Sequence, residues 1–332
     1  MEYEEILNNL KNKIYHPIYF LMGDESYFID QISDYIAGNV LTKADQDFNQ
    51  YILYGKDVDA NAIITYARRF PMMTNYQVVI VREAQNIKKI EELEPYVNNP
   101  LKSTILVINY KYKTIDRRKA FAKTLAKKGI LFESKKIYDN KLPAWINSYL
   151  AEQQYSIDPQ ASAMLSEYLG TNLSKVANEL NKLIISLPKK TRISPDHVEK
   201  NIGISKDFNI FELQNALGEK NVLKSNQIIS YFAANPGSNP LPKTISTLYF
   251  YFMKLLTYHF LDDKSQNNVA ASLQVVPFFV PSYIAAARQY PIKKIVAIMS
   301  VLREFDMKSK GVGNVSSEMS DLQKEMIYKI LH

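Results

Sequence analysis

Short apolar runs alternate with amphipathic segments through about the first 140 residues of the chain. The runs at residues 18–22, 78–81 and 104–108 are typical of strands buried on both faces of a parallel sheet. Shorter runs predict two more strands, at residues 50–54 and 130–132. The intervening segments predict helices at residues 27–40, 61–69, 90–96 and 116–128. Strands that alternate with helices predict an α/β domain over residues 1–140.

From Leu142 onward the apolar positions recur at helical spacing, and we expect no strand there. Capping residues predict helices at residues 159–169, 173–187 and 195–203, which form a small helical domain over residues 141–205. Further helices predict an all-helical third domain over residues 206–332, of the kind that often serves in oligomerisation. These helices are expected at residues 209–217, 221–233, 242–261, 281–289, 292–307 and 317–331. Breaks between them are expected at residues 235–237, 262–268 and 311–313.

The turn after the first predicted strand is Gly23-Asp24-Glu25-Ser26, in which Glu25 or Ser26 can cap the next helix. A strand, a glycine turn and a helix are the setting of a phosphate-binding loop. That loop also needs a lysine for the phosphates and a Ser or Thr for Mg²⁺. Here Asp24 and Glu25 stand in place of the lysine, and their charges would repel a triphosphate. We therefore expect the architecture of a nucleotide-binding domain without bound nucleotide.

Composition excludes several kinds of site. The chain of 332 residues has no cysteine, which rules out disulfides, a thiolate zinc site and a cysteine nucleophile. The four histidines are scattered without ligand spacing, so we expect no metal site. The first residues are acidic, unlike the start of a signal peptide, and no apolar run approaches the length of a membrane span. We expect no association with a membrane.

The formal net charge of +7 is concentrated in one segment. Residues 111–136 contain ten Lys or Arg residues and two acidic residues, on a near-neutral background. One interpretation is a contact with the phosphates of a nucleic acid. The other is a solvated helix that turns Phe121 and Leu125 toward a core. The residues that would lie near DNA under the first interpretation are Arg117, Arg118, Lys119, Lys123 and Lys127.

A second candidate contact is the connection between the helix at residues 61–69 and the strand at residues 78–81. It reads Phe70-Pro71-Met72-Met73-Thr74, and Pro71 ends the helix. Connections usually lie at the surface, and methionine suits adaptable apolar contacts with another protein. The alternative, that Met72 and Met73 turn inward against the core, stays open on the residues alone.

Several segments together resemble the delta subunit of the bacterial DNA polymerase III clamp loader. They are the opening PIYFLMGDESYFIDQI, the connection RRFPMMTNYQVVIVREA and the basic helix TIDRRKAFAKTLAKKG, followed by LPAWINSYL, LGTNLSKVANELNKL and LREFDMKSKG. The similarity extends over essentially the whole chain. No one segment is diagnostic, but their order and spacing match the family.

The resemblance implies a fold of three parts. These are a RecA-like α/β domain of the AAA+ type without a functional P-loop, a small helical lid domain and a helical collar. It implies that the chain binds and opens the ring-shaped sliding beta clamp by docking two apolar residues into it. The corresponding positions are Met72 and Met73, within a clamp-binding segment made of Phe70, Pro71, Met72, Met73 and Thr74. Phe or Leu is commoner at those two positions in the family.

The resemblance also implies partners and a setting. Members of this family hydrolyse no ATP themselves, so no cofactor and no catalytic residue is expected in this chain. ATP is expected on the neighbouring tau/gamma subunits of a ring that also includes delta-prime. The family is part of the DNA-directed DNA polymerase holoenzyme, acts on primed DNA during DNA replication and is cytoplasmic. In ATP-using relatives an Arg lies near the start of the helix after Gly170, where this chain has Ser174.

Two other functions remain as alternatives. The first is an active NTPase with a diverged phosphate-binding loop, which would turn over ATP by itself. The second is a stand-alone basic DNA-binding protein, which would bind DNA tightly and in a salt-dependent manner. No compact nucleic-acid-binding motif is visible in the sequence to support the second alternative.

Overall fold

The computed structural model of the chain describes residues 1–203, 205, 207–313 and 316–332. Its internal contacts divide the chain into two compact units, Met1–Ile137 and Tyr138–His332. The first unit ends close to the expected domain boundary at residue 140. The division of the second unit into two domains stays a prediction, and Lys206, at which the third domain was expected to begin, lies outside the described residues.

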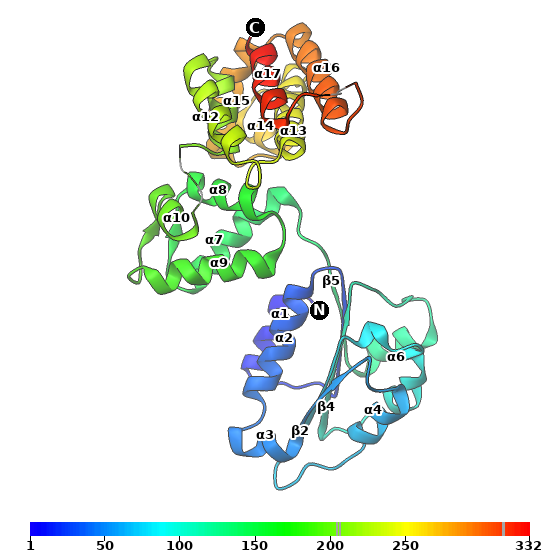
Figure 1. Cartoon of the computed structure of the whole chain (residues 1–332). Helices are drawn as coiled ribbons and strands as arrows, with labels where there is room; N and C mark the ends of the chain where they lie inside the picture. The colour runs from blue at the N-terminus through cyan, green and yellow to red at the C-terminus, as the bar shows by residue number, and fades with distance from the viewer. Residues whose placement is uncertain (204, 206, 314–315) are drawn as a thin grey trace. The chain divides into compact units, whose positions relative to one another are not determined.

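A parallel sheet lies at the centre of the first unit (Figure 1). The strands follow the order β2-β3-β4-β1-β5, and each is parallel to its neighbours. Their bounds are β1 (Ile18–Gly23), β2 (Gln50–Tyr54), β3 (Gln77–Arg82), β4 (Thr104–Lys111) and β5 (Ile130–Ser134). β1, β3 and β4 occupy the interior of the sheet and are almost wholly buried, which explains their continuous apolar runs. The strands predicted for this domain are confirmed.

Helices cover both faces of the sheet (Figure 1). On one face lie α1 (Tyr3–Lys11) and α2 (Ser26–Asn39), and on the other lie α4 (Ala60–Ala67) and α6 (Ala120–Lys128). Successive residues of β1 point to opposite faces, so Tyr19 joins the first core and Phe20 the second. The unit also contains α3 (Lys43–Asn49), η1 (Ala84–Asn86), η2 (Ile90–Leu93) and α5 (Glu94–Asn98). The sequence pattern predicts neither α1 nor α3.

Two helices of this unit differ from their predicted bounds. The helix expected from residue 116 begins at Ala120, because Asp116 holds the preceding residues in a turn. The backbone N–H of Arg118 donates to Asp116 Oδ1 (2.9 Å), and that of Lys119 donates to the Asp116 carbonyl (3.1 Å). The helix expected over residues 90–96 is instead the 3₁₀ helix η2 followed by α5, because Pro95 starts a new helix in its first turn.

The first part of the second unit contains η3 (Asp139–Lys141), α7 (Leu142–Glu152), α8 (Pro159–Leu169), α9 (Leu173–Ser186) and α10 (Pro195–Ile202). Asn172 caps α9 as expected, because its Oδ1 accepts the backbone N–H of Lys175 (3.0 Å). The expectation that no strand occurs here is wrong. β6 (Ser156–Ile157) pairs in parallel with β7 (Arg192–Ile193), and strands of two residues are too short to produce a periodic pattern.

The rest of the second unit is helical and has one apolar core. Its helices are α11 (Ile210–Gly218), α12 (Val222–Ala234), α13 (Leu241–His259), α14 (Gln266–Leu273), η4 (Pro277–Phe279), α15 (Val280–Gln289), α16 (Ile292–Ser309) and α17 (Met319–Leu331). The break expected over residues 262–268 is too long, because α14 begins inside it. Within the described residues, no single helix is long and apolar enough to cross a membrane. The pair Gln266–Leu273 and Pro277–Gln289, bent by 108°, qualifies together by length and composition only.

Candidate functional site

The connection between α4 and β3 presents the predicted contact residues to solvent. We call residues 70–74 the docking loop. The side chain of Met73 is fully exposed, and those of Phe70 and Met72 are 76% and 60% exposed. Pro71 and Thr74 are partly buried. Of the two orientations that the sequence left open, the structure therefore has both methionines pointing outward.

A buried amide holds the middle of the docking loop in place. Asn49 is the last residue of α3 and is 2% exposed. Its Nδ2 donates to the Met72 carbonyl (3.0 Å), and its Oδ1 accepts the Met72 backbone N–H (2.6 Å). Both backbone polar groups of Met72 are thus satisfied by one side chain from another element, while the Met72 side chain points away.

A second buried amide fixes the end of α4 where the docking loop begins. Gln77, at the start of β3, donates through Nε2 to the Ala67 carbonyl (3.2 Å) and to Thr104 Oγ1 (2.7 Å). Thr104 Oγ1 in turn donates to the same carbonyl (2.9 Å). The guanidinium of Arg69 lies over the ring of Tyr66, 4.4 Å from its centroid. The chain that enters the loop is therefore fixed by the sheet and by a stacked side chain.

Other exposed apolar side chains lie on the elements that adjoin the docking loop, and the sequence pattern gave no reason to single them out. Phe48 is exposed at the end of α3, and Ile52 and Tyr54 are exposed on β2, the edge strand beside β3. Alternation along an edge strand is the usual signal for such residues, but β2 is too short to make it decisive.

The backbone at the end of β1 is packed closely against β5. Gly23 has φ +119°, and a Cβ built on it would lie 2.1 Å from the carbonyl oxygen of Ser134. Its backbone N–H donates to the Lys113 carbonyl (3.0 Å), and its own carbonyl accepts the N–H of Tyr112 (2.9 Å). Both backbone polar groups of Gly23, the glycine of the strand-turn-helix segment, are therefore bonded to a neighbouring chain segment.

Glu25 occupies the N-terminus of α2, where an anion would otherwise bind. Its Oε1 accepts the backbone N–H of Tyr27 (3.1 Å), and its carbonyl accepts the hydroxyl of Ser134 (2.7 Å). Of the two predicted caps, Glu25 is therefore the one used. The residue is buried, and desolvation raises the pKa of its carboxyl, although the hydrogen bond from Tyr27 opposes this shift.

Lys111 is a largely buried cation at the carboxyl end of β4. Its Nζ lies 2.8 Å from Asp30 of α2 and 3.3 Å from Glu83, which follows β3. Burial alone would lower the pKa of Lys111, but the hydrogen bonds and charges of the two carboxylates raise it overall. The charge of Lys111 is therefore paired with these two carboxylates, and the pairs join α2 to the sheet.

The basic segment is partly neutralised by ion pairs. Arg117 pairs with Glu133 (2.8 Å), Arg118 with Asp116 (2.9 Å) and Lys119 with Glu91 (3.2 Å). Lys123 and Lys127 are exposed on α6, and neither has an ion-pair partner among the residues that the structure describes. The five predicted DNA-proximal residues therefore do not form one helical row, because Arg117 and Arg118 precede α6 and Lys119 is its N-cap.

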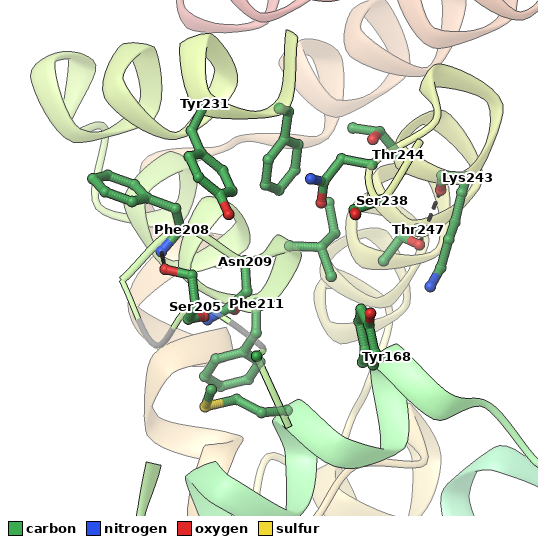
Figure 2. A pocket seen from close by; sticks show the side chains of 15 residues that line it. Tyr168, Ser205, Phe208, Asn209, Phe211, Tyr231, Ser238, Lys243, Thr244 and Thr247 are labelled. Carbon is green, nitrogen blue, oxygen red and sulfur yellow. Dashed lines mark hydrogen bonds between the residues drawn. The ribbon is translucent and has the colours of Figure 1, made fainter. Parts of the chain in front are cut away.

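A cavity of about 80 Å³ lies in the second unit, bordered by α8, α11, α12 and α13 (Figure 2). Figure 2 shows the stacked rings of Phe208 and Tyr231 (centroids 5.3 Å apart) beside Ser205, whose hydroxyl accepts the N–H of Phe208 (3.0 Å). The lining is aromatic, amide and hydroxyl, with Lys243 at one side. No cluster of His, Cys, Asp and Glu suited to a metal ion occurs in the described part of the chain.

Comparisons with known proteins agree with the sequence resemblance. Residues 19–135 match the family described as "DNA polymerase III, delta subunit". The DNA polymerase III subunit delta of Bacillus subtilis (strain 168) is 25% identical over 318 residues, which is 92% of this chain and 91% of that protein. The resemblance to delta subunits is confirmed. The match of residues 19–135 includes the turn at Gly23, the docking loop and all but the last residue of the basic segment.

A solved structure, the Bacillus subtilis DNA clamp loader delta protein, extends the likeness to the whole fold. It is 22% identical, covers 99% of each chain and has a TM-score of 0.55. The predicted fold class, an α/β domain followed by a helical part, is confirmed, apart from the two-residue strands β6 and β7. The chain is thus similar to the delta subunit of DNA polymerase III, and its role in a clamp loader stays a prediction. The roles of Met72, Met73 and the basic residues stay predictions.

Proposed function

We propose that this chain is the clamp-opening delta subunit of a DNA polymerase III clamp loader. The docking loop binds the sliding beta clamp and favours its open form for loading onto primed DNA. The observation that carries the proposal is the outward presentation of Met72 and Met73 by a loop whose backbone is fixed. Exposed apolar side chains on a rigid loop suit a pocket on a protein partner.

The opening step is a matter of differential affinity. A partner shifts a conformational equilibrium only by the difference between its affinities for the two forms. Burying one methionine side chain on binding contributes about 1.5–3 kcal/mol. If docking at Met72 and Met73 is complete only on the open clamp, the pair supplies a few kcal/mol toward opening.

ATP turnover belongs to the tau/gamma subunits in this proposal, and delta-prime completes the ring. Three features of this chain support the assignment of no ATP to it. Both backbone polar groups of Gly23 are bonded to a neighbouring segment, Glu25 occupies the end of α2, and Lys111 is bound to carboxylates. These features also oppose the alternative of an NTPase with a diverged loop.

Primed DNA is the further proposed partner, contacted through phosphates rather than bases. Lys123 and Lys127 are the better candidates, because Arg117, Arg118 and Lys119 are already paired with carboxylates. Exposed ion pairs are weak, so the paired residues contribute to the field around DNA but are less available for direct contact. Such contacts are independent of sequence and sensitive to salt.

The test compares the wild-type chain with the variant Met72→Ala/Met73→Ala for binding to the immobilised sliding clamp. The variant is expected to bind at least about a hundredfold more weakly, since two truncated hot-spot residues lose about 3–5 kcal/mol. It should still assemble with the tau/gamma and delta-prime subunits. Met319→Ala, which removes an exposed methionine from the second unit, is the matched control and should bind the clamp like the wild type.

Each failure has a distinct meaning. Clamp binding that survives in the double variant would place the contact elsewhere on the chain. Absence of clamp binding by the wild type, with tight and salt-dependent binding of the lone chain to DNA, would favour the stand-alone DNA-binding protein. ATP turnover by the isolated chain would favour the NTPase.

A further inference from the structure

We propose that Asn49 is the positioning residue of the docking loop. It keeps Met72 and Met73 in the conformation that binds the partner, without touching the partner itself. The inference rests on the proposed function, because it assigns a residue to the same contact. It adds a residue from α3, an element that the sequence pattern does not predict and that lies 23 positions before Met72 in the chain.

The geometry of Asn49 suits this role. A side-chain amide offers a donor and an acceptor in one plane, so it can satisfy the N–H and the carbonyl of a single residue. Asn49 does this for Met72, and its Nδ2 lies 3.2 Å from the Asp45 carbonyl within α3 as well. The side chain is therefore fixed to α3 and to the loop at once.

The docking loop needs such support because its own conformation is unfavourable. Pro71 has no backbone N–H to contribute, and Met73 has φ +58°, a left-handed conformation that non-glycine residues seldom adopt. The exposed side chains of Phe70, Met72 and Met73 would also gain by turning toward apolar surface. The loop would therefore leave the outward conformation if the bonds to Met72 were lost.

A loop held in its bound conformation changes binding kinetics in a characteristic way. When only a fraction of molecules has the competent loop, apparent affinity falls by that fraction. If the loop exchanges rapidly, the loss appears in the association rate, because the complex itself retains the contacts of Met72 and Met73. Truncating a contacting side chain instead raises the dissociation rate. The two rates thus separate positioning from contact.

The experiment measures association and dissociation rates of the full chain on the immobilised sliding clamp. Asn49→Ala is expected to lower the association rate about tenfold. This factor corresponds to a loss of about 1.4 kcal/mol when the two hydrogen bonds between Asn49 and Met72 are removed. Its dissociation rate should stay near that of the wild type, whereas Met73→Ala should raise the dissociation rate. In the free chain, amide hydrogen exchange at Met72 should become faster in Asn49→Ala.

Two further variants control for general loss of structure. Asn109→Ala removes another buried amide of the same domain, which donates to Ser33 Oγ (3.0 Å) away from the loop, and it should leave the association rate unchanged. Asn49→Asp keeps the shape and the acceptor for the Met72 N–H but places an oxygen against the Met72 carbonyl. It should slow association as Asn49→Ala does, and it serves where the alanine variant fails to fold.

The outcomes are distinguishable. If the wild type binds through Met72 and Met73 but both Asn49 variants associate at the wild-type rate, Asn49 has no positioning role. If the association rate of Asn109→Ala falls as much as that of Asn49→Ala, the effect is general destabilisation of the domain. This outcome would also overturn the inference. Absence of clamp binding by the wild type would overturn the proposed function, and this inference with it.

Discussion

Replacing Gly23 by alanine tests the close approach of β1 to β5 at the turn after β1. Gly23 pairs with Ser134 of β5 in the sheet, and its φ of +119° is rarely adopted by residues with a side chain. The added Cβ would lie 2.1 Å from the Ser134 carbonyl oxygen and 2.9 Å from its carbonyl carbon. These atoms are backbone, so relief requires β1 and β5 to move apart.

The expected loss of stability follows from two contributions. Holding a residue in a sparsely populated backbone conformation lowers the free energy of unfolding by about 1–3 kcal/mol. Forcing extra volume into a closely packed site lowers it by about another 1–3 kcal/mol. The sum for Gly23→Ala is roughly 2–6 kcal/mol, a large part of the roughly 5–15 kcal/mol that stabilises a typical domain.

Gly38→Ala is the matched control, because it makes the same chemical change with the opposite expected sign. Gly38 lies within α2, and a Cβ there would meet no atom within 4 Å. Alanine in place of glycine at a compatible helical position stabilises by roughly 0.5–1 kcal/mol. The pair therefore separates the effect of the close approach from that of an added methyl group.

The assay is hydrogen exchange of the full chain, read by mass spectrometry on separate peptides. Gly23→Ala should speed exchange in peptides from β1 and β5, and Gly38→Ala should slow exchange in α2. Peptides from Tyr138–His332 provide an internal reference that neither change should affect. Exchange of β1 and β5 at the wild-type rate in Gly23→Ala would refute the close approach of the two strands at this position.

Two further predictions concern Glu25 and the basic segment. Because burial raises the pKa of Glu25 above its ordinary 4.5, its ionisation weakens the fold as the pH rises through that raised value. Glu25→Gln should be the more stable protein at neutral pH, and urea unfolding should show this difference vanishing in acid. In the assembled loader, Lys123→Ala/Lys127→Ala should weaken binding to primed DNA and reduce the salt slope by about 0.9 per lost phosphate contact. Arg118→Ala should change this slope less, since Arg118 is paired with Asp116; an equal effect of both changes would contradict the assignment.

Features set by local pattern could be predicted from the sequence. The buried strands were recognisable from their continuous apolar runs, and Glu25 and Asn172 from their positions before helices. α1 and α3 escaped prediction because their sequences, YEEILNNLK and KADQDFN, are short and mostly polar. Propensity in such segments is weak, and packing against the sheet decides their structure.

The candidate site depended more on contacts between distant positions. The sequence placed Met72 and Met73 in a connection but left their orientation open, and the hydrogen bonds that hold the Met72 backbone come from Asn49, 23 positions earlier in the chain. The charge count of the basic segment likewise did not reveal that Glu91 and Glu133 would pair with two of its cations. Hydrogen bonds and ion pairs of this kind become visible only when the chain is folded.

The turn at Gly23 and the docking loop lie at opposite ends of the strands of one parallel sheet. The turn at Gly23 follows the carboxyl end of β1, whereas the docking loop precedes the amino end of β3. The hydrogen bonds that fix the docking loop and the end of α4 before it come from Asn49 and Gln77, and among the described residues the turn at Gly23 supplies none of these bonds. The loop is thus supported by local hydrogen bonds instead of by an occupied nucleotide site. In the proposed function, we therefore expect ATP on the neighbouring subunits to control access to the loop, and not its conformation, which hydrogen bonds within this chain support.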